Sequence, residues 1–311
     1  PYVGQVWYNQ NLGDLRVRKT NLNNAWSTGG NMNTARAGLG GAGTQTAALA
    51  FGGTAPPFTG VTESYNGSAW TTVNPMNTAR REIASAGTTT SALASGGDAP
   101  GASALTESWN GSSWTEVADL NTARRGTAGC GASNTSALTF GGGPPNKGET
   151  ESWNGSAWTE VSDLNQVRKQ LAGFGIQTSA LAFGGQTPAP ANTAETELWN
   201  GTSWFQVNSL NEVKRLLTGA GTTNTAGLAI GGEGPPLLSS TESWNGAVWT
   251  ETNNLNTARN SLAGAGTNTA ALAFGGSLPG SPTTATEEWN ANFAYGVWAT
   301  GGSLNTARNS L

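Results

Sequence analysis

The sequence predicts an all-β fold, a seven-bladed β-propeller of four-stranded antiparallel blades. A phrase such as Leu120-Asn121-Thr122-Ala123-Arg124 recurs about every 44 to 49 residues along the 311-residue chain. Each copy is followed by a Gly pair, and then by two aromatic residues on either side of an Asn-Gly step. A repeat of about 40–50 residues that contains four short strands is typical of a propeller blade.

The first complete unit shows how each strand is recognised. We expect strands at 37–43, 47–51, 62–65 and 70–73. Strand one is rich in Gly and Ala, which suits the crowded centre of a propeller. The Asn66-Gly67 step predicts a tight hairpin between the last two strands, because a type I′ turn needs positive φ at both central residues. Such steps can also form N-glycosylation sequons, but we expect the turn to be their role.

The number of blades is predicted from the complete units and from what remains at the two ends. The units cover 36–79, 80–123, 124–167, 168–213, 214–258 and 259–307. The remaining segments 4–9, 13–18 and 25–29 predict strands two to four of another blade, with Trp26 as its outer Trp. The segment 308–311 predicts the start of its strand one. We therefore expect one domain, 1–311, in which 1–35 and 308–311 form a seventh blade and both termini close the propeller, which removes free sheet edges.

The composition excludes several classes of function. There is no His, and Cys130 is the single Cys, so a Ser-His-Asp triad, a Cys-His pair and His-ligated metal sites are excluded. We expect no catalytic residue, no cofactor and no metal. The net charge of −4 argues against nucleic acid as a partner. No apolar run reaches the roughly 18 residues that a membrane span needs, so we expect no membrane insertion.

The order of a basic residue, an apolar run, a Gly pair, an aromatic turn and a second Trp resembles the kelch repeat. This resemblance implies a kelch-like propeller. In the present chain, Trp153-Asn154-Gly155 stands where kelch repeats usually have Tyr-Asp. The opening phrase Gly4-Gln5-Val6-Trp7-Tyr8-Asn9 is similar to a hairpin phrase of bacteriophage tail and fibre proteins. That similarity implies a repeat protein of a phage virion.

The periodic basic and Glu residues predict structural ion pairs. Six equivalent copies argue against a single active site built from paired carboxylates. We expect the pairs to fix the register of the blades more than they stabilise the fold. The residues that we assign to these ion pairs in the first three units are Arg36, Glu63, Arg80, Glu107, Arg124 and Glu151.

The connections between strands two and three differ most among the units, and all should emerge on one face. Varied loops on a uniform scaffold are the usual place for recognition. Apolar and Pro residues mark this candidate binding face. They are Phe58, Pro100, Pro145, Pro188, Leu237, Leu238 and Pro279.

Two functional hypotheses follow. The first is a non-enzymatic, virion-associated propeller on a phage tail, fibre or capsid surface, located outside the cell. Its partners would be other virion proteins or a host-surface glycan or receptor, and the assembly can include homo-oligomers. The alternative is a secreted multivalent lectin with sugar sites between the blades, where a Trp stacks on the sugar. The Trp residues of these alternative sites are Trp70, Trp114, Trp158, Trp204 and Trp249.

Overall fold

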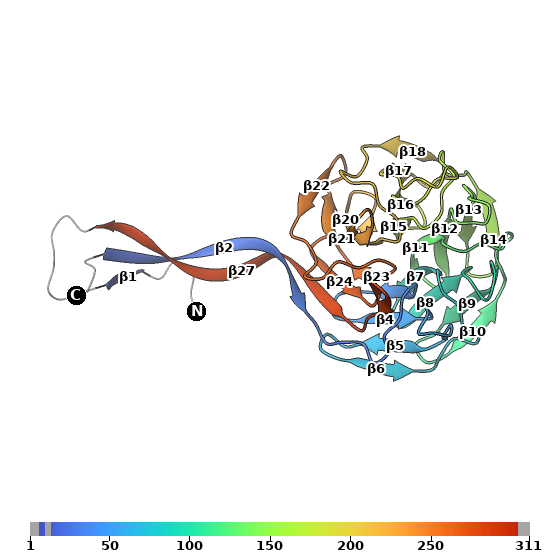
Figure 1. Cartoon of the computed structure of the whole chain (residues 1–311), viewed down its shortest axis with the longest axis horizontal. Helices are drawn as coiled ribbons and strands as arrows, with labels where there is room; N and C mark the ends of the chain where they lie inside the picture. Colours follow the sequence, from blue (N-terminus) through green and yellow to red (C-terminus); the bar gives the residue numbers. More distant parts are fainter. Residues whose placement is uncertain (1–5, 10–13, 304–311) are drawn as a thin grey trace. The chain divides into compact units, whose positions relative to one another are not determined.

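The computed structural model describes the backbone of residues 6–9 and 14–303 and the side chains of residues 24–291. The described residues form six four-stranded antiparallel blades, which surround a common centre (Figure 1). The first strand of each blade lies nearest the centre, and fourth strands such as β10 and β14 lie on the outside. The fold is therefore an all-β propeller, but the prediction of seven blades is wrong.

Five blades are formed by four consecutive strands. Blade 1 contains β3 (Gly40–Gly43), β4 (Ala48–Phe51), β5 (Thr62–Tyr65) and β6 (Trp70–Val73). Blade 2 contains β7 (Ala84–Thr88), β8 (Ser91–Ser95), β9 (Thr106–Trp109) and β10 (Trp114–Val117). Blade 3 contains β11 (Ala128–Ser133), β12 (Ser136–Phe140), β13 (Thr150–Trp153) and β14 (Trp158–Val161). Blade 4 contains β15 (Ala172–Ile176), β16 (Ser179–Phe183), β17 (Thr196–Trp199) and β18 (Trp204–Val207). Blade 5 contains β19 (Thr218–Thr223), β20 (Ala226–Glu233), β21 (Leu237–Trp244) and β22 (Trp249–Thr252).

Blade 6 combines strands from the two ends of the propeller sequence. It contains β23 (Ala263–Gly266), β24 (Ala270–Phe274), the start of β27 (Thr286–Ser303) and the end of β2 (Asp14–Thr28). The Gly29 N–H donates to Thr286 O at 2.9 Å, and the rings of Trp26 and Trp289 lie 5.4 Å apart. Trp26 thus occupies the fourth-strand position of blade 6, and not of a seventh blade.

The sixth sequence unit lacks the turn that would complete its own blade. Asn290-Ala291 follows Trp289, where the other units have Asn-Gly, and β27 continues for 18 residues without a hairpin. At the other end, β1 (Val6–Asn9) and the 15-residue β2 replace the predicted strands at 4–9, 13–18 and 25–29. The segment 308–311, predicted to open a seventh blade, lies outside the described residues. The absence of an Asn-Gly turn after Trp289 therefore explains why seven blades were predicted and six are present.

The chain divides into two compact units. One is the propeller, Trp26–Trp289, and the other combines Pro1–Ala25 with Asn290–Leu311. In the described part of the second unit, β1 pairs with β2, with Val6 opposite Val17, and β2 pairs in turn with β27. Within the propeller, β25 (Ser277–Leu278) and β26 (Ser281–Pro282) form a small hairpin in blade 6.

The Asn-Gly steps form hairpins as predicted, but the expected type I′ turn is wrong, because only the Gly has a positive φ, which in Gly67 is 93°, and the loop between the paired strands is longer than two residues. In blade 1, Tyr65 lies opposite Trp70 across the turn. The Asn66 Oδ1 accepts hydrogen bonds from the N–H groups of Ser68 (3.0 Å) and Ala69 (2.9 Å). A side-chain carbonyl that bonds the backbone two residues on is the usual reason for Asn in tight turns. The turn therefore explains the conserved spacing of this step within the chain.

The hydrophobic core lies between neighbouring blades. Trp114 of blade 2 packs on Phe51 of blade 1 with ring centroids 4.9 Å apart. Small side chains such as Ala42 and Ala92 fill the same interface nearer the axis. Large aromatic residues outside and Ala inside match the widening of the space between blades. This arrangement gives the propeller a core although only 36% of the residues of the whole chain are hydrophobic.

Candidate functional site

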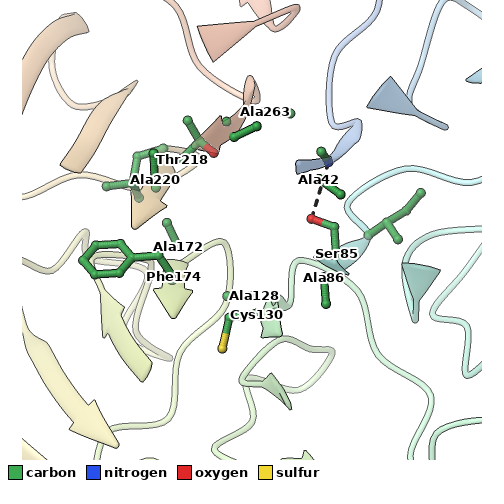
Figure 2. A pocket seen from close by; sticks show the side chains of 18 of the residues that line it. Ala42, Ser85, Ala86, Ala128, Cys130, Ala172, Phe174, Thr218, Ala220 and Ala263 are labelled. Carbon is green, nitrogen blue, oxygen red and sulfur yellow. Dashed lines mark hydrogen bonds between the residues drawn. The ribbon is translucent and has the colours of Figure 1, made fainter. Parts of the chain in front are cut away.

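A narrow channel runs through the centre of the propeller. Its volume is about 190 Å³, and all six inner strands line it. Figure 2 shows that the side chains of Phe174 and Cys130 point away from the channel and into the blades. Burial raises the pKa of the Cys130 thiol to about 12, so this thiol stays protonated and unreactive at neutral pH.

Six residues that line one mouth of the channel form a cycle of backbone hydrogen bonds. Each lies two positions after the basic residue of its unit and has a positive φ, which in Leu216 is 52°. We call them the left-handed ring, and each N–H donates to the carbonyl of the preceding blade at 2.7–3.2 Å. The bonds run from Glu82 to Gly38, Gly126 to Glu82, Gln170 to Gly126, Leu216 to Gln170, Ser261 to Leu216 and Gly38 to Ser261.

The Gly pairs form a second closed cycle. Gly52 and Gly53 both have positive φ, and a Cβ on Gly52 would lie 2.6 Å from Arg80 O. Only glycine permits both the conformation and this close approach. The N–H of the second Gly in each pair donates to the backbone carbonyl of the basic residue in the next repeat, at 2.8–3.0 Å. The bonds run from Gly53 to Arg80, Gly97 to Arg124, Gly142 to Arg168, Gly185 to Lys214, Gly232 to Arg259 and Gly276 to Arg36.

The fourth-strand Trp residues form a third closed cycle between blades. Each indole N–H donates to the first Thr of strand three in the preceding blade at 3.0–3.1 Å. These Trp side chains are 4–7% exposed, so their faces lie against protein and are not open for stacking on a sugar ring. The bonds run from Trp26 to Thr241, Trp70 to Thr286, Trp114 to Thr62, Trp158 to Thr106, Trp204 to Thr150 and Trp249 to Thr196.

Every blade contains one buried ion pair between the basic residue and the Glu of strand three. In blade 1, Arg36 Nη2 lies 3.0 Å from Glu63 Oε1, and both side chains are fully buried. The Arg36 guanidinium also donates to the Gly52 and Ala50 carbonyls, and Asn33 N–H donates to Glu63 Oε2 at 2.7 Å. The other pairs are Arg80–Glu107, Arg124–Glu151, Arg168–Glu197, Lys214–Glu242 and Arg259–Glu287.

These ion pairs connect the link between two blades to the body of the next blade. Burial lowers the pKa of Arg36 to about 10, and the charge of Glu63 acts in the opposite direction. The guanidinium therefore remains protonated at neutral pH. The pair fixes one register of link and blade, while its net contribution to stability is small, because desolvation offsets the attraction and Arg36 Nε is buried without a hydrogen-bond partner.

The links between blades and the strand two–three connections lie together on one face, which we call the connection face. Isolated bridges join them, for example between Ala37 and Thr54. On this face Pro100, Pro145, Pro188 and Pro279 are exposed. Leu237 and Phe58 are half-buried, with the Arg81 guanidinium 4.9 Å from the centre of the Phe58 ring. Leu238 is buried.

A charge cluster on the connection face joins blades 2 and 3. Asp98 is buried between Arg81 (3.1 Å) and Arg125 (3.0 Å). Burial acts to raise the pKa of Asp98, but the Gly101 N–H and the two guanidinium groups outweigh it, so the pKa lies below its ordinary value. Asp98 is therefore ionised at neutral pH, and it bridges a link to the adjacent strand two–three connection.

Sequence reasoning did not identify the left-handed ring or the Asp98 cluster. A signal for the ring exists at Gly38 and Gly126, since Gly recurs two positions after the basic residue. It is obscured because Glu82, Gln170 and Leu216 occupy the same position in other units. The Asp98 cluster has no equivalent in every blade, so periodicity cannot predict it.

No family model matches the chain, and a search of curated proteins finds no similar sequence. Among the described residues, no helix is long and apolar enough to span a membrane. The same residues contain no group of three or more His, Cys, Asp or Glu side chains that could hold a metal ion. The chain is thus a β-propeller of repeated blades with Trp and Thr at fixed positions.

Proposed function

We propose that this chain is a non-enzymatic recognition module of an extracellular particle, such as a bacteriophage tail, fibre or capsid surface. Its partners are a bacterial surface molecule or neighbouring proteins of the particle. The resemblance of the opening phrase to phage tail and fibre proteins, and of the repeats to kelch, supports this setting. The fold by itself does not specify a function.

The observation that carries the proposal is where the blades differ. Their interiors repeat the same ion pair, Trp–Thr bond and Gly pair, whereas the connection face changes from blade to blade. The connection of blade 5 is a tight extension of β20 and β21, and that of blade 6 contains β25 and β26. Variation limited to one face of a rigid scaffold is typical of a recognition surface.

A direct test is adsorption of the fluorescently labelled 311-residue chain to a panel of bacteria with outer-membrane and with thick-wall envelopes. We expect saturable adsorption to at least one envelope class. Pro188→Asp and Pro279→Asp, on the connection face, should weaken it. Ala69→Asp and Ala157→Asp are matched controls, because these exposed residues lie in the Asn-Gly turns.

The outcomes separate clearly. Absence of saturable adsorption across the panel would overturn the recognition role. Adsorption that the turn variants weaken as much as the connection-face variants would overturn the assignment of the face.

A further inference from the structure

The second compact unit contains a long sheet edge that no described strand covers. β27 has 18 residues, and its neighbours in the sheet are β24 and β2. Because β24 has five residues, it flanks only the start of β27, in blade 6. From residue 291 to residue 303, which we call the edge segment, β2 is the only described strand that runs beside β27 (Figure 1). On the other side of the edge segment, the backbone N–H and C=O groups therefore have no partner among the described strands.

The other outer edges of the described residues are short or charged. The outer strands of blades 1 to 5 have four residues each, and three of them contain a Glu. In the second unit, β1 covers β2 only from Asp14 to Val17. The uncovered part of β2 then begins with Arg18 and Lys19. Short strands and charged residues, above all Lys, are common means by which proteins prevent an edge from pairing with another chain.

The edge segment has none of these protective features. Its 13 residues include no Asp, Glu, Lys, Arg or Pro. Its central part contains Phe293, Tyr295, Val297 and Trp298, which are aromatic and β-branched types that favour strands. A long edge without charge or Pro is a template on which a further strand can pair through its main chain. The two edges of the unit therefore differ, since charge protects one and leaves the other free to pair.

The lack of charge also indicates which strand pairs there. In a two-fold symmetric antiparallel pair, each residue lies opposite a residue of the same segment. A segment with one sign of charge would then bring like charges together, which destabilises the pair. This repulsion is expected for the part of β2 that contains Arg18 and Lys19, but not for the edge segment. A second copy of the chain therefore meets the requirements of this edge without a partner of complementary charge.

We propose that the edge segment pairs with the edge segment of a second copy of this chain, antiparallel and about a two-fold axis. Two ribbons joined in this way form a four-stranded sheet, in the order β2, β27, β27 of the partner and β2 of the partner. Two strands alone are marginally stable in water, whereas three or more strands can be stable. The inference goes beyond the proposed function, because it concerns the second unit and not the connection face.

Sedimentation velocity of the 311-residue chain at about 1–100 µM tests the association. We expect a species of twice the 31.6 kDa of one chain, which dissociates on dilution. Val297→Lys places a charge on the edge segment and should raise the dissociation constant of the dimer about tenfold or more. The matched control is Thr20→Lys in β2, which should leave the constant unchanged. An unchanged thermal transition shows that each variant keeps its folded propeller.

Cross-linking tests the pairing itself. Cys130 is the single Cys and is buried, so an introduced Cys provides the accessible thiol. Single Cys substitutions are made at each position from 293 to 298, and Thr20→Cys is the control. A disulfide needs Cα atoms within about 7 Å, so only residues near the two-fold axis can link to their own copy. We expect covalent dimers at one or two neighbouring positions of the edge segment and none at Thr20→Cys.

Several results would overturn the inference. They are a monomer at the highest concentration, a trimer or larger assembly, equal weakening of the dimer by both Lys variants, and cross-linking that does not depend on position. The proposed function is tested separately. A monomeric chain that still adsorbs to bacteria refutes only the pairing of β27, whereas a dimer that adsorbs to no envelope class refutes only the proposed function.

Discussion

Gly227 and Phe174 form a size-matched pair across the interface between blades 4 and 5. The equivalent pairs elsewhere are two small residues, such as Ala42 with Ala92 and Ala86 with Ala137. A Cβ on Gly227 would approach three atoms of the Phe174 ring to less than 3.0 Å. We therefore predict that Gly227→Ala destabilises the propeller, but only while Phe174 is present.

The structure gives the expected size of each effect. Gly227→Ala overpacks the interface and should cost about 1–3 kcal/mol of unfolding free energy. Phe174→Ala removes ring contacts with Phe183 (5.4 Å) and Trp249 (6.4 Å) and should cost about 3–5 kcal/mol. In the Phe174→Ala variant, Gly227→Ala fills the space left by the ring and reduces backbone freedom in the unfolded chain. There it should raise the unfolding free energy by about 1 kcal/mol. The coupling between the two changes is then about 2–4 kcal/mol.

Denaturant unfolding of the wild type, the two single variants and the double variant, followed by Trp fluorescence, measures the coupling. Thermal denaturation provides a second readout, with about 2 °C expected per kcal/mol for a propeller of this size. The double variant should be more stable than Phe174→Ala alone. An equal loss of stability from Gly227→Ala in both backgrounds would refute the size-matching explanation.

Three further predictions concern single residues. Leu216→Gly should raise the unfolding free energy by about 0.5–1 kcal/mol in thermal denaturation, because the φ of 52° strains any residue with a Cβ; an unchanged or lower Tm would contradict this. The folded pKa of Asp98 lies below its ordinary value, so its contribution to stability is present above about pH 4 and lost as the pH falls through the folded pKa. Asp98→Asn should therefore reduce the difference in Tm between neutral and acidic buffer, and an equal difference in both proteins would count against the cluster. Burial and the hydrogen bond to Glu288 raise the pKa of Tyr65 to about 12, so its contribution is present below pH 10 and lost between about pH 10 and 12. Tyr65→Phe should lose less stability than the wild type over that interval, and the same alkaline loss in both would argue against the Tyr65–Glu288 bond.

Much of each blade was predictable from the repeat. The strands predicted at 62–65 and 70–73 coincide with β5 and β6, because the Asn-Gly turn between them determines their register. Strand one was predicted from residue 37 but begins at Gly40. The difference arises because Gly38 takes the left-handed conformation and joins the ring at the channel mouth. The periodic signal of this bond is weak, because only two of the six units, at Gly38 and Gly126, have a Gly two positions after the basic residue.

The site was less predictable than the fold. The pairing of Arg36 with Glu63 follows from equal periodicity, and periodicity also explains why the Trp residues are core residues. The Asp98 cluster depends instead on residues that only some units have, namely Arg81, Asp98 and Arg125. A single sequence shows these residues but not that they lie side by side, because that requires the pairing of each link with a strand two–three connection.

The three hydrogen-bonded cycles have a consequence for how the number of blades can change. Each cycle joins blades head to tail, so every interface is a heterologous contact that imposes a rotation on the next blade. Such contacts close only when the rotations add up to a full turn, which for six blades is about 60° at each interface. A duplicated blade would need every interface to open to a smaller angle at the same time, with all three kinds of bond adjusted together. Blade number in this propeller is therefore a property of interface geometry, and gain or loss of one sequence repeat would leave an open arc instead of a larger or smaller ring.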